Sequence, residues 1–160
     1  MASKAEKAVE SFKRLVGKPE QPGEWLQITQ ERINQFADCT MDHQFIHVDP
    51  EKSAQLSPYK VTIAHGFLTL SMLTHLTTTV KAEATDAYDG VVMGVNYGFD
   101  KVRFVNAVKV NSRIRVHRKL VDVQLKGTNN VQLTHECTIE IEGEAKPACI
   151  ANWLTMLVYG

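Results

Sequence analysis

The 160-residue sequence predicts an α+β fold in which one long, buried helix is followed by an antiparallel β-sheet. Apolar residues occur on all sides of residues 64–81, which is typical of a helix surrounded by protein. The second half, residues 91–159, contains strand-like segments, and residues 113–117 and 138–142 alternate charged with aliphatic side chains. Such alternation indicates a sheet with one solvated face. The length fits a single domain over residues 1–160.

Short elements are predicted before the long helix. Residues 1–17 place apolar side chains at helical spacing and end in a glycine, which predicts an amphipathic helix. We interpret this helix as packed on its own domain rather than as a clamp for a partner. A short strand over residues 25–28 and a helix over residues 29–37 follow, and Phe36 would point inward from that helix.

The middle of the chain is predicted to be a loop that ends in a second short helix. Residues 36–50 are polar and end in Asp49-Pro50, where aspartate can cap a helix and proline can occupy its first position. That helix would end near Gln55. In the second half, strands are expected at residues 91–99, 102–104, 113–123, 131–142 and 146–159.

Composition narrows the class of protein. Acidic and basic residues are equal in number, so the net charge gives no reason to expect nucleic acid or an anionic membrane as a partner. No apolar run approaches the roughly 20 residues that a membrane helix needs. The three cysteines, Cys39, Cys137 and Cys149, have no CxxC spacing, and no apolar signal segment opens the sequence. We therefore expect a cytoplasmic protein.

Candidate catalytic residues lie between the loop and the long helix. Asp42 and His47 are five residues apart in the predicted loop, and a carboxylate beside an imidazole can hold a water molecule and exchange protons with it. The long helix opens at His65-Gly66, where glycine lets backbone approach a ligand closely. Unpaired N–H groups in the first turn could then stabilise a carbonyl oxygen that acquires negative charge.

Two motifs carry a resemblance to a known family. Residues 36–50 read FADCTMDHQFIHVDP and residues 63–68 read IAHGFL, and weaker similarity continues through residues 96–104. Together they resemble the MaoC-like dehydratases, or (R)-specific enoyl-CoA hydratases, and most closely the NodN-like branch. The resemblance implies a hot-dog fold, in which a curved antiparallel β-sheet wraps around a long central α-helix. It also implies a homodimer with pockets near the dimer interface.

The resemblance assigns roles to individual residues. Asp42 and His47 match the family's catalytic pair, Gly66 matches its backbone oxyanion donor, and Thr74 falls where related hydratases carry a supporting hydroxyl. Met41 stands where the family has glycine, so it would strain the backbone if φ is positive there, or fill part of the substrate pocket. His65 could polarise a carbonyl or hydrogen-bond the loop, and both roles stay open.

The activity implied by the resemblance is that of a hydro-lyase in fatty acid metabolism. Water would add reversibly to a trans-2-enoyl-CoA thioester and give the (R)-3-hydroxyacyl thioester. The CoA thioester is the substrate, and no metal or redox cofactor is required. Two alternatives remain: a hot-dog protein that binds an acyl thioester without converting it, and an acyl-CoA thioesterase.

Other polar residues have weaker functional readings. A zinc site at His43 and His47, with Asp49 or His65, is disfavoured because the chain breaks at Pro50 and no cysteine pair accompanies the histidines. One basic group could meet the phosphates of CoA or form a solvated face; it comprises Lys101, Arg103, Lys109, Arg113 and Arg115. Solvated or hydrogen-bonded roles are expected for His75, His117 and His135.

Overall fold

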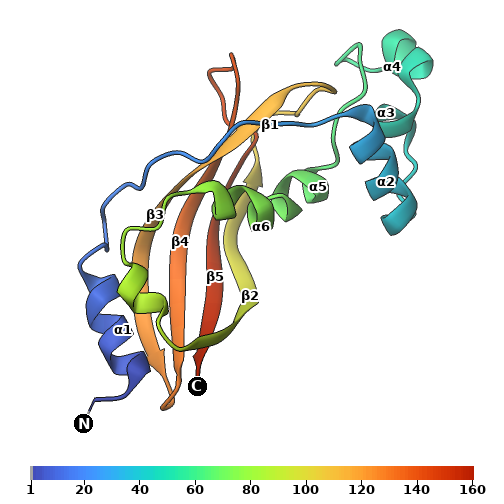
Figure 1. Ribbon diagram of the computed structural model, residues 1–160. Coiled ribbons are helices and arrows are strands. Elements are labelled where there is room, and N and C mark those ends of the chain that lie inside the picture. Colours follow the sequence, from blue (N-terminus) through green and yellow to red (C-terminus); the bar gives the residue numbers. More distant parts are fainter. Residues whose placement is uncertain (1) are drawn as a thin grey trace.

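One curved antiparallel sheet dominates the structure, a computed structural model that describes residues 2–160 (Figure 1). Met1, part of the predicted first helix, lies outside the described residues. The strand order is β1-β3-β4-β5-β2, and every pair is antiparallel. The strands are β1 (Leu26–Gln27), β2 (Val91–Phe104), β3 (Arg113–Lys126), β4 (Asn130–Ile141) and β5 (Cys149–Tyr159). The α+β class predicted from the sequence is confirmed.

The predicted central helix lies across the concave face of this sheet, but in three consecutive pieces (Figure 1). These are α5 (Gly66–Ser71), α6 (Leu73–Leu76) and a 3₁₀ turn, η1 (Thr77–Thr79). The prediction of one regular helix over residues 64–81 was therefore wrong in its regularity and its ends. Each hydroxyl of the three consecutive threonines donates to a carbonyl three or four residues earlier, which competes with regular helical hydrogen bonding.

This helical segment is buried on one side only. Leu73 and Leu76 are almost fully buried in the main core, whereas the side chain of Phe67 is 70% exposed. The expectation of a helix buried around most of its circumference was thus wrong for the single chain. An exposed aromatic residue on a core helix leaves apolar surface for another molecule to cover.

The first helix, α1 (Lys4–Lys13), covers the end of the sheet that lies away from α5 (Figure 1). Ser3 caps it, and Glu6 completes the capping box by accepting from the Ser3 N–H. Its apolar side chains form a second cluster with residues of β3, β4 and β5, including Phe12 and Leu133. The helix therefore packs on its own domain, as interpreted from the sequence, although it is shorter than the predicted residues 1–17.

Three short helices stand away from the sheet: α2 (Gln30–Thr40), α3 (Phe45–Val48) and α4 (Pro50–Leu56) (Figure 1). Thr29 caps α2 and Asp49 caps α4, each through a side-chain oxygen that accepts a backbone N–H three residues on. The predicted loop over residues 36–50 is mostly helical, since α2 continues to Thr40. Only residues 41–44 and Asp49 lie outside these helices.

Strand β2 forms one edge of the sheet and is longer than predicted. Residues 91–104 form a single strand because an irregularity near Lys101, which adopts a φ of 54°, joins the two predicted segments. Only one side of β2 pairs, with β5. Large apolar side chains are exposed along it, at Val92, Met93, Val95 and Tyr97.

In residues 2–160, no helix is long and apolar enough to span a membrane.

Candidate active site

His47 is a buried imidazole whose orientation is fixed by a backbone carbonyl. It lies in α3, is 7% exposed, and its Nδ1 is 2.7 Å from the carbonyl oxygen of Ile63. A carbonyl oxygen can only accept a hydrogen bond, so Nδ1 carries the proton in this arrangement. The opposite nitrogen, Nε2, is therefore unprotonated and can accept a proton.

His65 lies against His47 and holds the loop that carries Asp42. The two imidazole rings are stacked with their centroids 3.8 Å apart, and Phe36 packs on His65 at 5.0 Å. His65 Nε2 donates to the backbone carbonyl of Asp42 at 2.9 Å, whereas its buried Nδ1 has no partner within residues 2–160. Of the two roles left open from the sequence, this contact fits the one in which His65 positions the loop.

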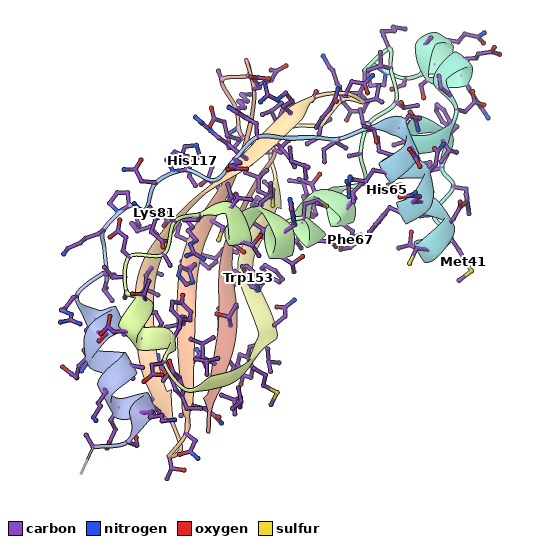
Figure 2. All side chains as sticks on the ribbon, in the orientation of Figure 1. Met41, His65, Phe67, Lys81, His117 and Trp153 are labelled. Atoms are coloured by element: carbon purple, nitrogen blue, oxygen red, sulfur yellow. The ribbon has the colours of Figure 1, made fainter. Side chains whose placement is uncertain are left out.

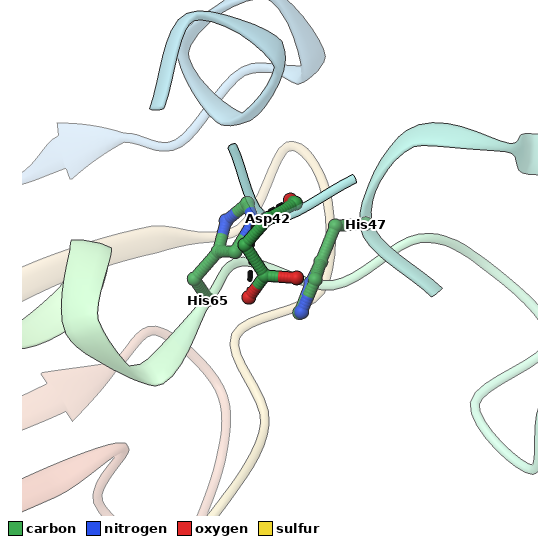
Figure 3. Close-up of side chains that lie close together, drawn as sticks. All are labelled: Asp42, His47 and His65. Carbon is green, nitrogen blue, oxygen red and sulfur yellow. Dashed lines mark hydrogen bonds and ion pairs between the residues drawn. The ribbon is translucent and has the colours of Figure 1, made fainter. Parts of the chain in front are cut away.

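The side chains of Asp42, His47 and His65 point toward one another (Figure 3). One polar atom from each lies within 4.8 Å of those of the other two, and Asp42 Oδ2 is 4.0 Å from His65 Nε2. The Asp42 side chain is 52% exposed, so its carboxylate remains accessible to water and substrate. The local fold thus unites a carboxylate and an imidazole that the sequence placed five residues apart.

The protonation state of His47 suits a general base. Burial lowers the pKa of His47 below its ordinary value of 6.5, and the nearby His65 acts in the same direction. The hydrogen bond to Ile63 and the charge of Asp42 raise this pKa but only partly offset burial. His47 is therefore neutral near pH 7, with a lone pair available on Nε2.

The ring geometry favours proton transfer over metal binding. Imidazole lone pairs lie in the ring plane, and the planes of His47 and His65 are only 24° from parallel, so their free nitrogens do not converge on one ion. His43 and Asp49, which the zinc hypothesis also used, are engaged elsewhere. His43 pairs with Asp38 at 2.8 Å, and Asp49 caps α4.

A pocket of about 220 Å³ adjoins His47 and the start of α5. Gly66 lines it, and within the described chain the Gly66 N–H has no acceptor. The ring of Phe104 covers Gly66 so closely that an added Cβ would lie 3.1 Å from it. Glycine therefore allows both the close ring and an open N–H at the positive end of a helical turn.

Two residues predicted for the site lie elsewhere. Met41 is the C-cap of α2, is 83% exposed, and its side chain points away from the molecule (Figure 2). Its φ of 61° is the left-handed conformation for which glycine is favoured, so the predicted strain is present while the predicted filling of the pocket is not. Thr74 donates to the carbonyl of Ser71 and lines a separate cavity.

The basic residues divide into two groups. Arg113 and Arg115 form ion pairs with Glu142 and Glu140, which fits the solvated-face interpretation. The other three have no ion pair within residues 2–160, and they flank a segment that lines the pocket; they are Lys101, Arg103 and Lys109. Only this second group stays available for an anionic ligand.

Sequence reasoning missed other residues that line the pocket. Tyr59, Asn106 and Thr69 line it, and none of them was assigned a role from the sequence. Thr69 is buried and hydrogen-bonds the His65 carbonyl. A periodicity argument could have found Thr69, three residues after Gly66 on the same side of the helix. No local signal identifies the other two.

Comparison with known proteins places the chain in a family. The MaoC like domain matches residues 11–140 of the chain. Nodulation protein N of Rhizobium leguminosarum bv. viciae is 45% identical over 136 residues, which cover 85% of this chain and 82% of that protein. The 3-hydroxyacyl-thioester dehydratase Z of Mycobacterium tuberculosis (strain ATCC 25618 / H37Rv) is 48% identical over 138 residues, covering 84% and 85%.

Solved structures share the fold at low sequence identity. R-hydratase PhaJ1 from Pseudomonas aeruginosa has a TM-score of 0.66 at 19% identity, over 91% of this chain and 83% of that chain. A protein from Archaeoglobus described as a monoamine oxidase regulatory protein has a TM-score of 0.70 at 19% identity, over 91% of both chains. These likenesses confirm the hot-dog fold expected from the motifs. The domain match and the two curated relatives show that the chain belongs to the MaoC-like dehydratase family.

Proposed function

We propose that this protein is an enoyl-CoA hydratase, or in the reverse direction a 3-hydroxyacyl-CoA dehydratase, of fatty acid metabolism. Membership of the MaoC-like family supports a hydro-lyase activity. The observation that carries the proposal is the unprotonated Nε2 of His47, fixed by Ile63 and placed beside the Asp42 carboxylate. These groups adjoin a pocket that also contains the free N–H of Gly66.

In the proposed reaction, a water molecule is held between the Asp42 carboxylate and His47 Nε2. As its oxygen attacks C3 of the enoyl thioester, His47 accepts the departing proton. Electron density moves from the double bond to the thioester oxygen, and the Gly66 N–H stabilises the resulting enolate. The proton then passes from the conjugate acid of the pair to C2, which gives the (R)-3-hydroxyacyl thioester. The mechanism uses no metal or redox cofactor.

A homodimer is part of the proposal, and the exposed edge of β2 supports it. An unpaired edge strand with apolar side chains such as Val92 and Met93 invites pairing with a second copy. The exposed Phe67 lies on the helix that crosses the concave face, so a partner could cover it as well.

Lys101, Arg103 and Lys109 supply positive charge near the pocket for the phosphates of CoA.

Matched substitutions test the proposal. His47→Ala and Asp42→Ala should each lower kcat for hydration of a medium-chain trans-2-enoyl-CoA by roughly two to four orders of magnitude. The controls are His43→Ala and Asp38→Ala. These two exposed residues lie in the same region, but they contact each other and not His47 or Asp42. The controls should keep near wild-type rates. Wild-type rates in His47→Ala or Asp42→Ala would refute the assigned mechanism.

A Met41 side chain that filled the substrate pocket would favour the binding-only alternative. Because Met41 is exposed at the outer end of α2, it does not obstruct the pocket beside His47. The thioesterase alternative requires water to attack the thioester carbon instead of C3. Release of free CoA thiol from saturated acyl-CoA would favour it, and hydration without thiol release favours the hydratase.

A further inference from the structure

A second and larger cavity lies farther along the concave face. It has a volume of about 530 Å³ and is bounded by α6, η1 and strands β2, β4 and β5. None of the three residues of the Asp42–His47–His65 cluster lines it. Several of its lining side chains are polar: Thr74, Thr77, Asn96, Arg118, His135 and Thr155. A cavity that received only a hydrocarbon chain would need no such groups.

His135 is a polar side chain of this cavity whose ring has no hydrogen bond within the described chain. It lies on β4 and is 7% exposed, and its ring nitrogens are not fully enclosed and keep contact with the open space of the cavity. The expected solvation of His135 can therefore occur only through this cavity, because the rest of the side chain is buried. Burial, with a smaller effect from Arg118, lowers the pKa of His135 to about 3. The neutral imidazole offers one N–H donor and one acceptor to whatever occupies the cavity.

The charge in this cavity is already balanced. Arg118 donates from Nε and Nη2 to the two carboxylate oxygens of Glu20, and both side chains are nearly buried. Such a bidentate pair satisfies the guanidinium charge, so the cavity has no free cation to attract an anion. Nearby, Trp153 lies beneath α6 and donates from Nε1 to Asn96 Oδ1 at 2.8 Å (Figure 2). The cavity is thus polar but electrically neutral.

The helical segment carries lining residues of both pockets, among them Gly66 of the catalytic pocket and Thr74 of this cavity. Residues eight apart lie near the same side of a helix, so Gly66 at the first pocket and Thr74 at the second face in similar directions. The rise from Gly66 to Thr74 is about 12 Å, the reach of a chain of roughly ten carbon atoms. A thioester held at the Gly66 N–H would therefore place the far end of a medium-length acyl chain in the second cavity.

We propose that the second cavity receives the distal end of the acyl chain, and that His135 selects chains carrying an uncharged oxygen, as a hydroxyl or keto group, at that end. The inference rests on the proposed function only for the position of the thioester. A hydroxyl both donates and accepts, which matches a neutral imidazole. A methyl end would displace water from the nitrogens of His135 and leave them unpaired, and a carboxylate would lose its hydration without gaining a free cation.

Binding of saturated acyl-CoA thioesters tests this inference without depending on hydration. Three ten-carbon chains, ending in methyl, hydroxyl and carboxylate, are compared by calorimetry on the full-length protein. The hydroxyl chain should bind about five- to tenfold more tightly than the methyl chain, and the carboxylate chain most weakly. His135→Leu should abolish the preference for hydroxyl, whereas His135→Gln, which keeps a donor and an acceptor, should retain most of it.

The matched control is His117→Leu, a histidine on the neighbouring strand β3 that pairs with Glu140 and does not line the cavity. It should bind the three chains as the wild type does. Equal affinities for the methyl and hydroxyl chains, or a hydroxyl preference that survives in His135→Leu, would overturn the inference. A preference that depends on His135, in a protein that fails to hydrate enoyl thioesters, would uphold the inference and refute the proposed function.

Discussion

Replacement of His135 by leucine should change how stability depends on pH. The pKa of His135 is lowered to about 3 by burial, from an ordinary value of 6.5. Because the folded pKa lies below the unfolded one, the unfolded chain binds the proton more readily as the pH falls. The resulting stability is fully present above about pH 6.5 and is lost progressively toward pH 3.

The size of the effect follows from the same two pKa values. Each pH unit between them costs about 1.4 kcal/mol, so His135 should account for roughly 2 kcal/mol of lost unfolding free energy between pH 8 and pH 5. His135→Leu and His135→Gln both remove the titrating group but differ in polarity. Both should therefore lose this part of the pH dependence, whatever each does to stability at pH 8.

Urea denaturation at pH 8 and pH 5, at one fixed protein concentration, measures the effect. The wild type should lose roughly 2 kcal/mol more than either variant between these two conditions. An equal pH dependence in wild type and both variants would mean that His135 is solvated in the folded protein. That result would refute the burial argument and the cavity assignment that uses it.

Four further outcomes are expected. The acid limb of kcat/KM should have its midpoint below pH 6.5, because burial lowers the pKa of His47 and its neutral form is the base; a midpoint above that value would contradict the assignment. Met41→Gly should raise the unfolding free energy by about 1 kcal/mol in urea titrations, since φ is 61° there, and no gain would argue against strain. Gly66→Ala should displace Phe104 and cut kcat/KM at least about tenfold, whereas an unchanged rate would remove Gly66 from the mechanism. Met93→Glu, on the β2 edge, should shift sedimentation from dimer to monomer; an unchanged dimer would place the interface elsewhere.

Much of the site could be predicted because its parts are close in sequence. Asp42, His47 and Gly66 lie within 25 residues, and local signals such as the Asp49 cap fix the short helices between them. What local patterns could not supply is the carbonyl of Ile63 that orients His47, since this contact depends on how two loops meet. The exposure of Met41 likewise depends on where α2 ends.

His135 illustrates a signal that was present but misinterpreted. It has the same alternation along β4 as Leu133 and Cys137, which face the interior, so strand periodicity places it on the buried face. Its polarity argued for solvent instead, and the structure combines the two, since the side chain is mostly buried while it lines an open cavity. The central helix breaks at Met72 and ends in a run of threonines. The sequence predicted this break only in part, because threonine is also tolerated in regular helices.

If the proposed function is correct, water adds to C3 of an enoyl thioester at the Asp42–His47 pair. The most direct test is mass spectrometry of the products formed from a trans-2-enoyl-CoA in ¹⁸O-labelled water. The account predicts an intact CoA thioester that carries the label as a hydroxyl at C3, formed by the wild type and lost in His47→Ala. Label in a free carboxylate with release of CoA, or no labelled product at all, would contradict it.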